Sequence, residues 1–237
     1  MNILKSIIFW ILSIGGIIIL TIGVFILLSV LQSKLFLPEE YVMWIFKSPF
    51  SNLIFIYEIY IIFGFAYIFN KHLRWFIKNI LEAKNVFFKR YKIALLSIFI
   101  TLNILMIYTI LFNVTVITNS KIINYTFLSP QGKEYSYKDI VKIETGIYGK
   151  KQSFPYMRSK GEFYYIIHLN DGTKIDLAED GGTKNADDPR FIIEKLDMQY
   201  VNMGIYKQWS LDNFVFCTKH LDKIYTDKIR QIIENTK

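Results

Sequence analysis

The stretch that decides how this chain is organised is residues 161–177, GEFYYIIHLNDGTKIDL. Apolar and polar residues alternate on both sides of Asn170-Asp171-Gly172, which is typical of a β-hairpin with one face in a core. A two-residue loop at Asp171-Gly172 would mix apolar and charged side chains on one face. A type I turn at Asn170-Asp171 followed by Gly172 in the left-handed region keeps one face apolar, so we expect this three-residue loop.

This register predicts which side chains of the hairpin point into a core. The core face carries Tyr165, Ile167, Leu169, Ile175 and Leu177. The solvent face carries Tyr164, His168, Lys174 and Asp176. The hairpin is therefore expected to form one side of a small sheet in a water-soluble domain.

The part of the chain in front of the hairpin has a different composition. The whole chain has 237 residues, of which 52% are hydrophobic. Residues 1–117 carry four acidic and ten basic side chains, whereas residues 118–237 carry sixteen and eighteen. We therefore predict a membrane region over 1–117 and a soluble domain over 118–237. The net charge of +8 comes mostly from the membrane region, which favours anionic lipid as a partner and does not indicate nucleic acid.

Three stretches of the front region are long and apolar enough to cross a bilayer, and we place the spans at about 7–31, 49–70 and 93–117. The first follows Lys5 and lies in an uncharged run over 6–33. Because this run is about twice the usual length of a signal-peptide core and no small-residue cleavage site follows, it is interpreted as an uncleaved span.

The loop over residues 71–92 fixes the predicted orientation. It holds seven Lys or Arg residues and one acidic residue, so the positive-inside rule makes it cytoplasmic. The N-terminus is then cytoplasmic, and the soluble domain lies on the extracytoplasmic side of a cell membrane. The loop also has helical periodicity, and two interpretations stay open: an amphipathic helix in anionic headgroups, or a solvated turn with stop-transfer charges.

Glu58 is the one charged residue inside the predicted second span. A carboxyl group at this depth is costly unless it is protonated, paired or facing water. A proton or cation path is one interpretation, although the spans hold no second acid or base to pass a proton on. A hydrogen bond to another helix, at Thr101, Asn103 or Tyr108, is the favoured alternative.

The soluble domain is expected to be a small antiparallel sheet closed by C-terminal helices, an α+β fold. Strands are predicted over 114–118, 121–128, 134–137 and 139–148, in addition to the hairpin. One helix should begin at Asp188-Pro189 and end at Gly204, and a second should run from about Thr218 to Glu234.

A family resemblance rests on three segments in this order. They are residues 117–123 (ITNSKII), residues 137–143 (YKDIVKI) and the hairpin. Together they resemble the pleckstrin-homology-like (PH-like) domain found in some multi-span bacterial membrane proteins. The resemblance implies a PH-like sheet and a binding or scaffold module rather than a catalyst, and it transfers no ligand residues. The chain departs from that pattern by an insertion over 149–160 and by two helices, not one, after the sheet.

The insertion holds the candidate binding residues. Four bases alternate there with Phe154, Tyr156 and Met157, so this segment suits headgroups, a wall polymer or an acidic partner; a solvated loop is the alternative. The candidate bases are Lys150, Lys151, Arg158 and Lys160.

The acidic segment 176–188 offers Glu179, Asp180, Asp187 and Asp188 to calcium, but its spacing matches no EF-hand loop. A polar loop leading into the helix is the favoured interpretation.

Motifs for catalysis or cofactor binding are not found. His72, His168 and His220 have no metal-binding spacing, and the single Cys217, expected to be buried, forms no disulfide or thiolate zinc site within the chain. We therefore expect no enzyme, no cofactor and no metal. The expected function is that of a membrane-anchored interaction or regulatory protein with an unidentified protein partner; the alternative is a transport or channel subunit that uses Glu58.

Overall fold

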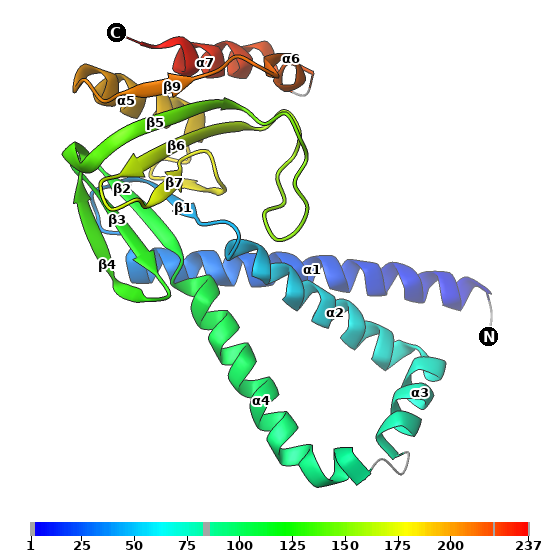
Figure 1. Ribbon diagram of the computed structural model, residues 1–237. Helices are drawn as coiled ribbons and strands as arrows, with labels where there is room; N and C mark the ends of the chain where they lie inside the picture. Colours follow the sequence, from blue (N-terminus) through cyan, green and yellow to red (C-terminus); the bar gives the residue numbers. More distant parts are fainter. Residues whose placement is uncertain (1–2, 83–85, 220, 237) are drawn as a thin grey trace. The chain divides into compact units, whose positions relative to one another are not determined.

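The computed structural model describes residues 3–82, 86–219 and 221–236. The chain divides into two compact units. Unit 1 comprises Met1–Ser33 and Leu53–Leu111, and unit 2 comprises Lys34–Asn52 and Phe112–Lys237. Unit 2 therefore joins a short segment from the front of the chain, blue in Figure 1, to the whole C-terminal half, green to red.

Unit 1 is built from helices. They are α1 (Ile3–Phe36), α2 (Ile54–Phe69, preceded by a 3-10 turn over Ser51–Leu53), α3 (Lys71–Glu82) and α4 (Val86–Leu111). Among the residues that the structure describes, three helical stretches, Ser13–Phe36, Ser51–Phe69 and Arg90–Leu111, are long and apolar enough to cross a membrane. The expected number of apolar helices is thus confirmed. The predicted third span over 93–117 is too long at its end, because the β-branched residues 114–118 form a strand instead.

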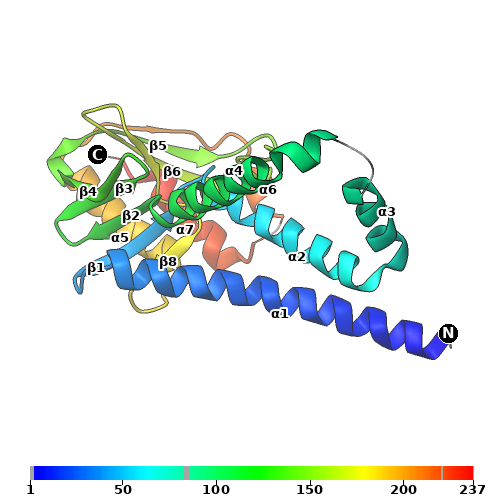
Figure 2. The ribbon, with the colours of Figure 1, turned by 90° about the horizontal axis from the view of Figure 1, so that it is seen from below.

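The basic segment between the second and third apolar helices is largely helical, and α3 joins the ends of α2 and α4 (Figure 2). The side-chain oxygen of Asn70 starts α3 by accepting hydrogen bonds from the backbone N–H groups of His72 and Leu73, at 2.9 and 3.1 Å. Leu73, Ile77 and Ile80 share one helix face, and the bases lie on the other. An amphipathic helix, rather than an irregular turn, is therefore present; Lys84 lies outside the described residues.

Side chains from different helices meet in unit 1 at a few points. Gln32, which is buried, donates from Nε2 to the backbone oxygens of Ile110 (3.0 Å) and Leu111 (3.3 Å). These carbonyls belong to the last turn of α4, so Gln32 satisfies acceptors that a helix end leaves open. Tyr57 of α2 donates to the backbone oxygen of Asn103 in α4 at 3.3 Å.

Unit 2 contains two sheets. The first has the strand order β4-β3-β2-β1-β8, and the second has the order β7-β6-β5-β9. The first sheet consists of β1 (Tyr41–Phe46), β2 (Val114–Thr118), β3 (Lys121–Thr126), β4 (Ser129–Ser136) and β8 (Gly181–Thr183). The second consists of β5 (Ile140–Ile147), β6 (Phe163–Leu169), β7 (Lys174–Asp176) and β9 (Lys207–Trp209). All pairs are antiparallel except β5 with β9.

Strand β1 corrects the predicted domain boundary. Residues 1–117 were all assigned to the membrane region, but residues 41–46 pair with β2 on one side and β8 on the other. Met43 and Ile45 are 1% and 0% exposed, so the strand contributes to the core. The compact unit that contains the sheets thus begins at residue 34 and resumes at 112, instead of starting at 118.

The pairing of β1 with β2 has the geometry of a hairpin. Phe46, the last residue of β1, faces Val114, the first residue of β2. The backbone N–H of Lys47 donates to the carbonyl oxygen of Asn113 at 3.2 Å. Helices α2, α3 and α4 are therefore inserted at the turn of a β-hairpin.

The acidic segment 176–188 contains the edge strand β8. A Cβ atom at Gly181 would lie 2.0 Å from the backbone oxygen of Trp44, so glycine is required for β8 to approach β1 this closely. This pairing explains the two adjacent glycines, which the prediction of a polar loop left without a role.

The β6–β7 hairpin has the predicted register. Ile167 faces Ile175, His168 faces Lys174, and Gly172 has a φ of 85°. All five residues predicted for the core face are at most 2% exposed. The assignment of Asp176 to the solvent face is wrong, because its side chain is buried among polar groups.

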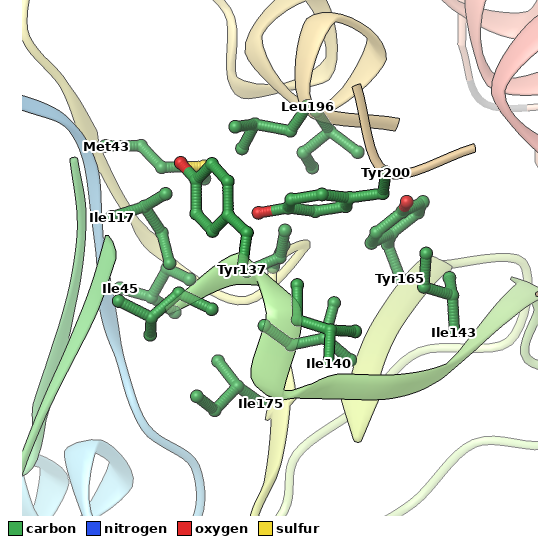
Figure 3. Packing of buried hydrophobic residues seen from close by; sticks show 14 of the residues in the cluster. Met43, Ile45, Ile117, Tyr137, Ile140, Ile143, Tyr165, Ile175, Leu196 and Tyr200 are labelled. Atoms are coloured by element: carbon green, nitrogen blue, oxygen red, sulfur yellow. The ribbon is translucent and has the colours of Figure 1, made fainter. Parts of the chain in front are cut away.

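The C-terminal part of unit 2 adds α5 (Pro189–Asn202) before β9, and α6 (Phe214–Cys217) and α7 (Lys223–Glu234) after it. Asp188 caps α5 as predicted, accepting from the N–H of Arg190 at 2.9 Å, and Gly204 has a φ of 80° just beyond its end. Figure 3 shows Leu196 and Tyr200 of α5 packed between side chains of the two sheets. Unit 2 is thus an antiparallel-sheet domain whose core is closed by a C-terminal helix.

A buried ion pair fixes the last helix. Lys207 of β9 and Asp197 of α5 lie 2.6 Å apart with side chains 3% and 1% exposed. Tyr165 donates to Asp197 at 2.7 Å, and Asn235 donates to its second oxygen at 2.7 Å. Because each oxygen of the Asp197 carboxylate has a donor, the buried charge is satisfied, and we interpret this network as structural.

Candidate functional site

A polar cavity of about 240 Å³ lies within unit 2 where the end of β1, the loop over residues 149–160 and the segment after β7 meet. Its wall includes Tyr148, Arg158, Asp176 and Glu179, which we call the Arg158 cluster. It is the strongest candidate site because it gathers several titratable side chains in one cavity.

Arg158 is the centre of this cluster. Its Nη2 lies 2.7 Å from Oε1 of Glu179 and 3.7 Å from Oδ2 of Asp176, and its Nη1 donates to the hydroxyl of Tyr148. The guanidinium carbon also lies 4.8 Å from the centre of the Tyr148 ring. The side chains of Arg158, Glu179 and Asp176 are only 18%, 13% and 7% exposed, so these charges compensate one another out of bulk water.

The two carboxylates are held by backbone donors as well. Oδ1 of Asp176 accepts from the N–H groups of Tyr165 (2.9 Å) and Ala178 (3.1 Å). Oε2 of Glu179 accepts from the N–H of Ser48 at 2.9 Å. The cluster therefore connects the chain after β1, the 149–160 loop and the β6–β7 hairpin through charge-assisted hydrogen bonds.

Burial favours the neutral form of three charged side chains at or near this cavity. Desolvation raises the pKa of Glu179 to about 7, and it also raises the pKa of Asp176. Burial lowers the pKa of Lys47 to about 8, although the charge of Glu179 opposes this effect. The protonation of Glu179 is thus set to change close to neutral pH.

The 149–160 loop is held against residues 48–52, which lead directly into α2. Nδ2 of Asn52 donates to the carbonyl oxygens of Pro155 (2.5 Å) and Tyr156 (3.2 Å). The hydroxyl of Ser48 donates to the same oxygen of Tyr156 at 3.3 Å. This loop is therefore held by the hydrogen bonds from Ser48 and Asn52 as well as by the Arg158 cluster.

The four predicted bases do not form one binding surface. Arg158 is largely buried and paired with Glu179, so it is not on the surface with the other three bases. Lys160 lies 3.4 Å from the centre of the Phe216 ring, a cation–π contact. Lys150 and Lys151 are exposed, and within the described part of the chain they form no ion pair. Only these two lysines remain as an exposed basic pair.

Glu58 lies in α2 and is partly exposed in the isolated chain. It forms no hydrogen bond or ion pair with any residue that the structure describes, so the predicted bond to Thr101, Asn103 or Tyr108 is not formed. Asn103 instead donates from Nδ2 to the backbone oxygen of Phe99 in its own helix at 2.8 Å.

The calcium alternative finds no support in the structure. Among residues 3–82, 86–219 and 221–236, no group of three His, Cys, Asp or Glu side chains is arranged to hold a metal ion. Glu179 pairs with Arg158, and Asp188 pairs with Arg190 at 2.8 Å. Cys217 is buried as predicted, and His220 lies outside the described residues.

No sequence pattern predicted the Arg158 cluster. Tyr148, Arg158 and Glu179 lie in three different segments that only the tertiary fold brings together. An Asp at position 176 on an otherwise consistent hairpin was the nearest hint, and it was assigned to solvent. No family model, curated protein or solved structure matched the chain.

Proposed function

We propose that this chain is a multi-pass membrane protein that presents a non-catalytic, PH-like interaction domain at the bilayer surface, with a regulatory role through a protein partner. The observation that carries this proposal is that unit 2 is built from two separate segments of the chain. Its first sheet takes β1 from the chain between α1 and α2, and the other strands from the chain after α4.

The shared sheet sets a condition on topology. Residues 34–52 and 112–237 must lie on the same side of a bilayer, because their strands are hydrogen-bonded to each other. Crossings by α2 and α4 return the chain to that side, and a crossing by α1 puts the N-terminus on the other. The basic segment 71–92 then lies with the N-terminus, and the positive-inside rule makes both cytoplasmic. Unit 2 is extracytoplasmic in this proposal.

Two features support a PH-like binding module. The strands β2-β3-β4 and β5-β6-β7 form two consecutive antiparallel meanders, and α5 closes the core between their sheets. The segment over residues 198–209 also exposes large apolar side chains suited to a protein partner: Met198, Met203, Tyr206 and Trp209. Within the Arg158 cluster the acids and the base are paired with one another, which favours a structural role over catalysis.

The partner is tested by photo-crosslinking in intact cells. A photoreactive amino acid at Tyr206, which is 65% exposed, should give a discrete adduct with a second protein. The same amino acid at Lys174, on the polar face of β7, is the matched control. Absence of an adduct at Tyr206, or equal adducts at both positions, would argue against a partner on this segment.

The topology is tested with single cysteines in a Cys217→Ser background. A membrane-impermeant maleimide should label Asn119→Cys in intact spheroplasts, and Lys78→Cys only after lysis. Labelling in the opposite order would place unit 2 in the cytoplasm.

A transport or channel subunit is the second candidate, and Glu58 favours it. A carboxyl group on an apolar helix, with no partner in the described chain, needs a partner from another molecule or access to water. Glu58→Gln should then dissociate a membrane complex seen on native gels, whereas Ile59→Leu should not. An unchanged complex in the Glu58→Gln variant would remove this candidate.

A further inference from the structure

One end of unit 2 is defined by the points where the chain passes between unit 2 and the apolar helices of unit 1. The ring of Phe36, at the end of α1, lies 5.2 Å from the ring of Phe112, which follows α4. Lys47, six residues before Leu53, is hydrogen-bonded to Asn113. The three connections to the helices of unit 1 thus emerge from neighbouring positions, which we call the connection end of unit 2.

Two exposed apolar tips lie at this connection end. The first is the 149–160 loop, held by Ser48 and Asn52, in which Phe154, Tyr156 and Met157 are 57%, 49% and 48% exposed. The second is the β3–β4 turn, where Leu128 is 88% exposed. Tyr125, just before this turn, packs on Phe36 at 4.6 Å.

The opposite ends of the same strands are polar. The β2–β3 turn is Asn119-Ser120, and the β6–β7 turn is Asn170-Asp171-Gly172. Asn170, in the second turn, donates to Asp139 at 2.9 Å. Ser136, three residues before Asp139, pairs with Lys121, which directly follows the first turn. The two turns therefore lie at the same end of unit 2. In Figure 1 the β3–β4 turn and the loop after β5 both extend to the side of unit 2 opposite α5 and α7. In both sheets, therefore, the apolar tip lies at the connection end and the polar turn at the far end.

We propose that the two tips, residues 127–128 and 154–157, insert into the headgroup region of an anionic bilayer beside the spans. This inference rests on the proposed membrane placement of the chain. Aromatic side chains prefer the membrane–water interface, and exposed apolar side chains gain free energy when they leave water. Lys150 and Lys151, exposed in the same loop, supply the charge that attracts anionic lipid.

The lipid is chosen as the occupant because of chain connectivity. Asn52 is the second residue of the apolar stretch Ser51–Phe69 and also holds the backbone of Pro155 and Tyr156. When that stretch enters a bilayer, the loop is held within a few residues of the entry point. A protein partner at this end would have to share the space with lipid.

The test measures depth in the membrane with the full-length chain. Phe154→Cys and Leu128→Cys, each in the Cys217→Ser background, are labelled with an environment-sensitive fluorophore and placed in nanodiscs of phosphatidylglycerol and phosphatidylcholine. Quenching by lipids with a shallow nitroxide should be about twofold or more above that at the far-end controls Asn119→Cys and Lys174→Cys. Equal quenching at tips and controls would overturn the proposal. Circular dichroism and thermal melting identify variants that do not fold, and for these Tyr156→Cys or Phe127→Cys provides the same measurement.

A probe at Ile62→Cys, in the middle of α2, separates this inference from the proposed function. If deep nitroxides quench Ile62→Cys while the tips behave like the controls, the spanning helices stand and tip insertion is wrong. If Ile62→Cys is not quenched either, the membrane placement itself fails, and the inference with it. Lys150→Glu with Lys151→Glu should reduce quenching at Phe154→Cys in anionic discs but not in discs of phosphatidylcholine alone; no reduction would remove the role of the two lysines.

Discussion

Isoleucine side chains are exposed in unit 1 and buried in unit 2. In unit 1, Ile93 and Ile104 are 84% and 61% exposed, whereas Ile45 and Ile143 in unit 2 are not exposed at all. The residue type is the same, but its spacing along the chain differs. Uninterrupted apolar runs produce helices that are apolar on all sides, and alternating runs produce strands with one buried face.

The polar groups show the same contrast. Unit 1 satisfies its backbone within helices, and Gln32 adds side-chain hydrogen bonds at the end of α4. Unit 2 buries whole charges and pairs them, as in Asp197–Lys207 and Glu179–Arg158. The apolar surface of unit 1 is compatible with a membrane location, whereas the paired charges of unit 2 are typical of a domain in water.

The largest expected effect comes from separating β1 from the rest of unit 2. A fragment of residues 112–237 should not fold, because it loses the buried side chains of Met43, Trp44 and Ile45, each contributing about 1.5–3 kcal/mol. It also leaves β8 without its partner strand and exposes the edge of β2 that pairs with β1. Circular dichroism and thermal melting of the purified fragment give the measurement.

The matched control uses the hairpin geometry of β1 and β2. Residues 34–52 joined to 112–237 by a short glycine-rich linker should fold as a water-soluble domain, and Ile45→Asp in this fusion should unfold it. A cooperative transition in the 112–237 fragment alone would show that β1 is not needed.

The next effect concerns the Arg158 cluster. Arg158→Leu should lower the free energy of unfolding by about 3–5 kcal/mol, because it leaves the buried carboxylates of Glu179 and Asp176 uncompensated. Adding Glu179→Met should recover part of this loss. Lys150→Ala with Lys151→Ala, in the same loop, should change it by less than about 0.5 kcal/mol. Denaturant unfolding of the hairpin fusion measures all three; equal effects would mean that Arg158 is not internal.

A pH dependence should follow from Glu179. Its pKa rises from an ordinary 4.5 to about 7 on folding, so between these values the folded state binds more protons than the unfolded state. The free energy of unfolding should therefore fall as the pH rises from 5 to 8, by up to about 3 kcal/mol from this group. Glu179→Gln should flatten the dependence, whereas Glu162→Gln, at an exposed position, should keep it. Melting temperatures across this range decide; an unchanged slope in Glu179→Gln would assign the effect to another group.

The smallest effect compares isoleucines directly. Ile45→Val in unit 2 should lower the free energy of unfolding by about 1 kcal/mol, since a buried methylene is lost. Ile93→Val in unit 1 should have little effect on thermal stability in detergent, because its side chain faces the surroundings. Similar losses at both positions would contradict the solvent contrast between the units.

The elements with strong local signals were predictable. The β6–β7 hairpin has one register with an apolar face, and Asp188, Pro189 and Gly204 mark the limits of α5, so local chemistry determined both. The apolar helices followed from length and composition alone.

The remaining features depend on contacts between distant segments. β1 is six residues between two prolines, and its partners lie about 70 and 140 residues further along the chain. Its aromatic and β-branched run YVMWIF is typical of a strand. It was not predicted as one because it lies between two predicted spans and was assigned to the membrane region. The Arg158 cluster had no comparable signal, because side chains of opposite charge occur throughout the loops and only the fold selects which of them meet.

The insertion of α2, α3 and α4 between β1 and β2 has a consequence for biosynthesis. β1 leaves the ribosome early, but the strand beside it is made only after two further apolar segments have been synthesised. The first sheet therefore cannot close until residues 47–113, which separate β1 from β2, have been synthesised. Until then β1 has neither of its partner strands, and the hydrogen-bonding groups on both of its edges stay unpaired.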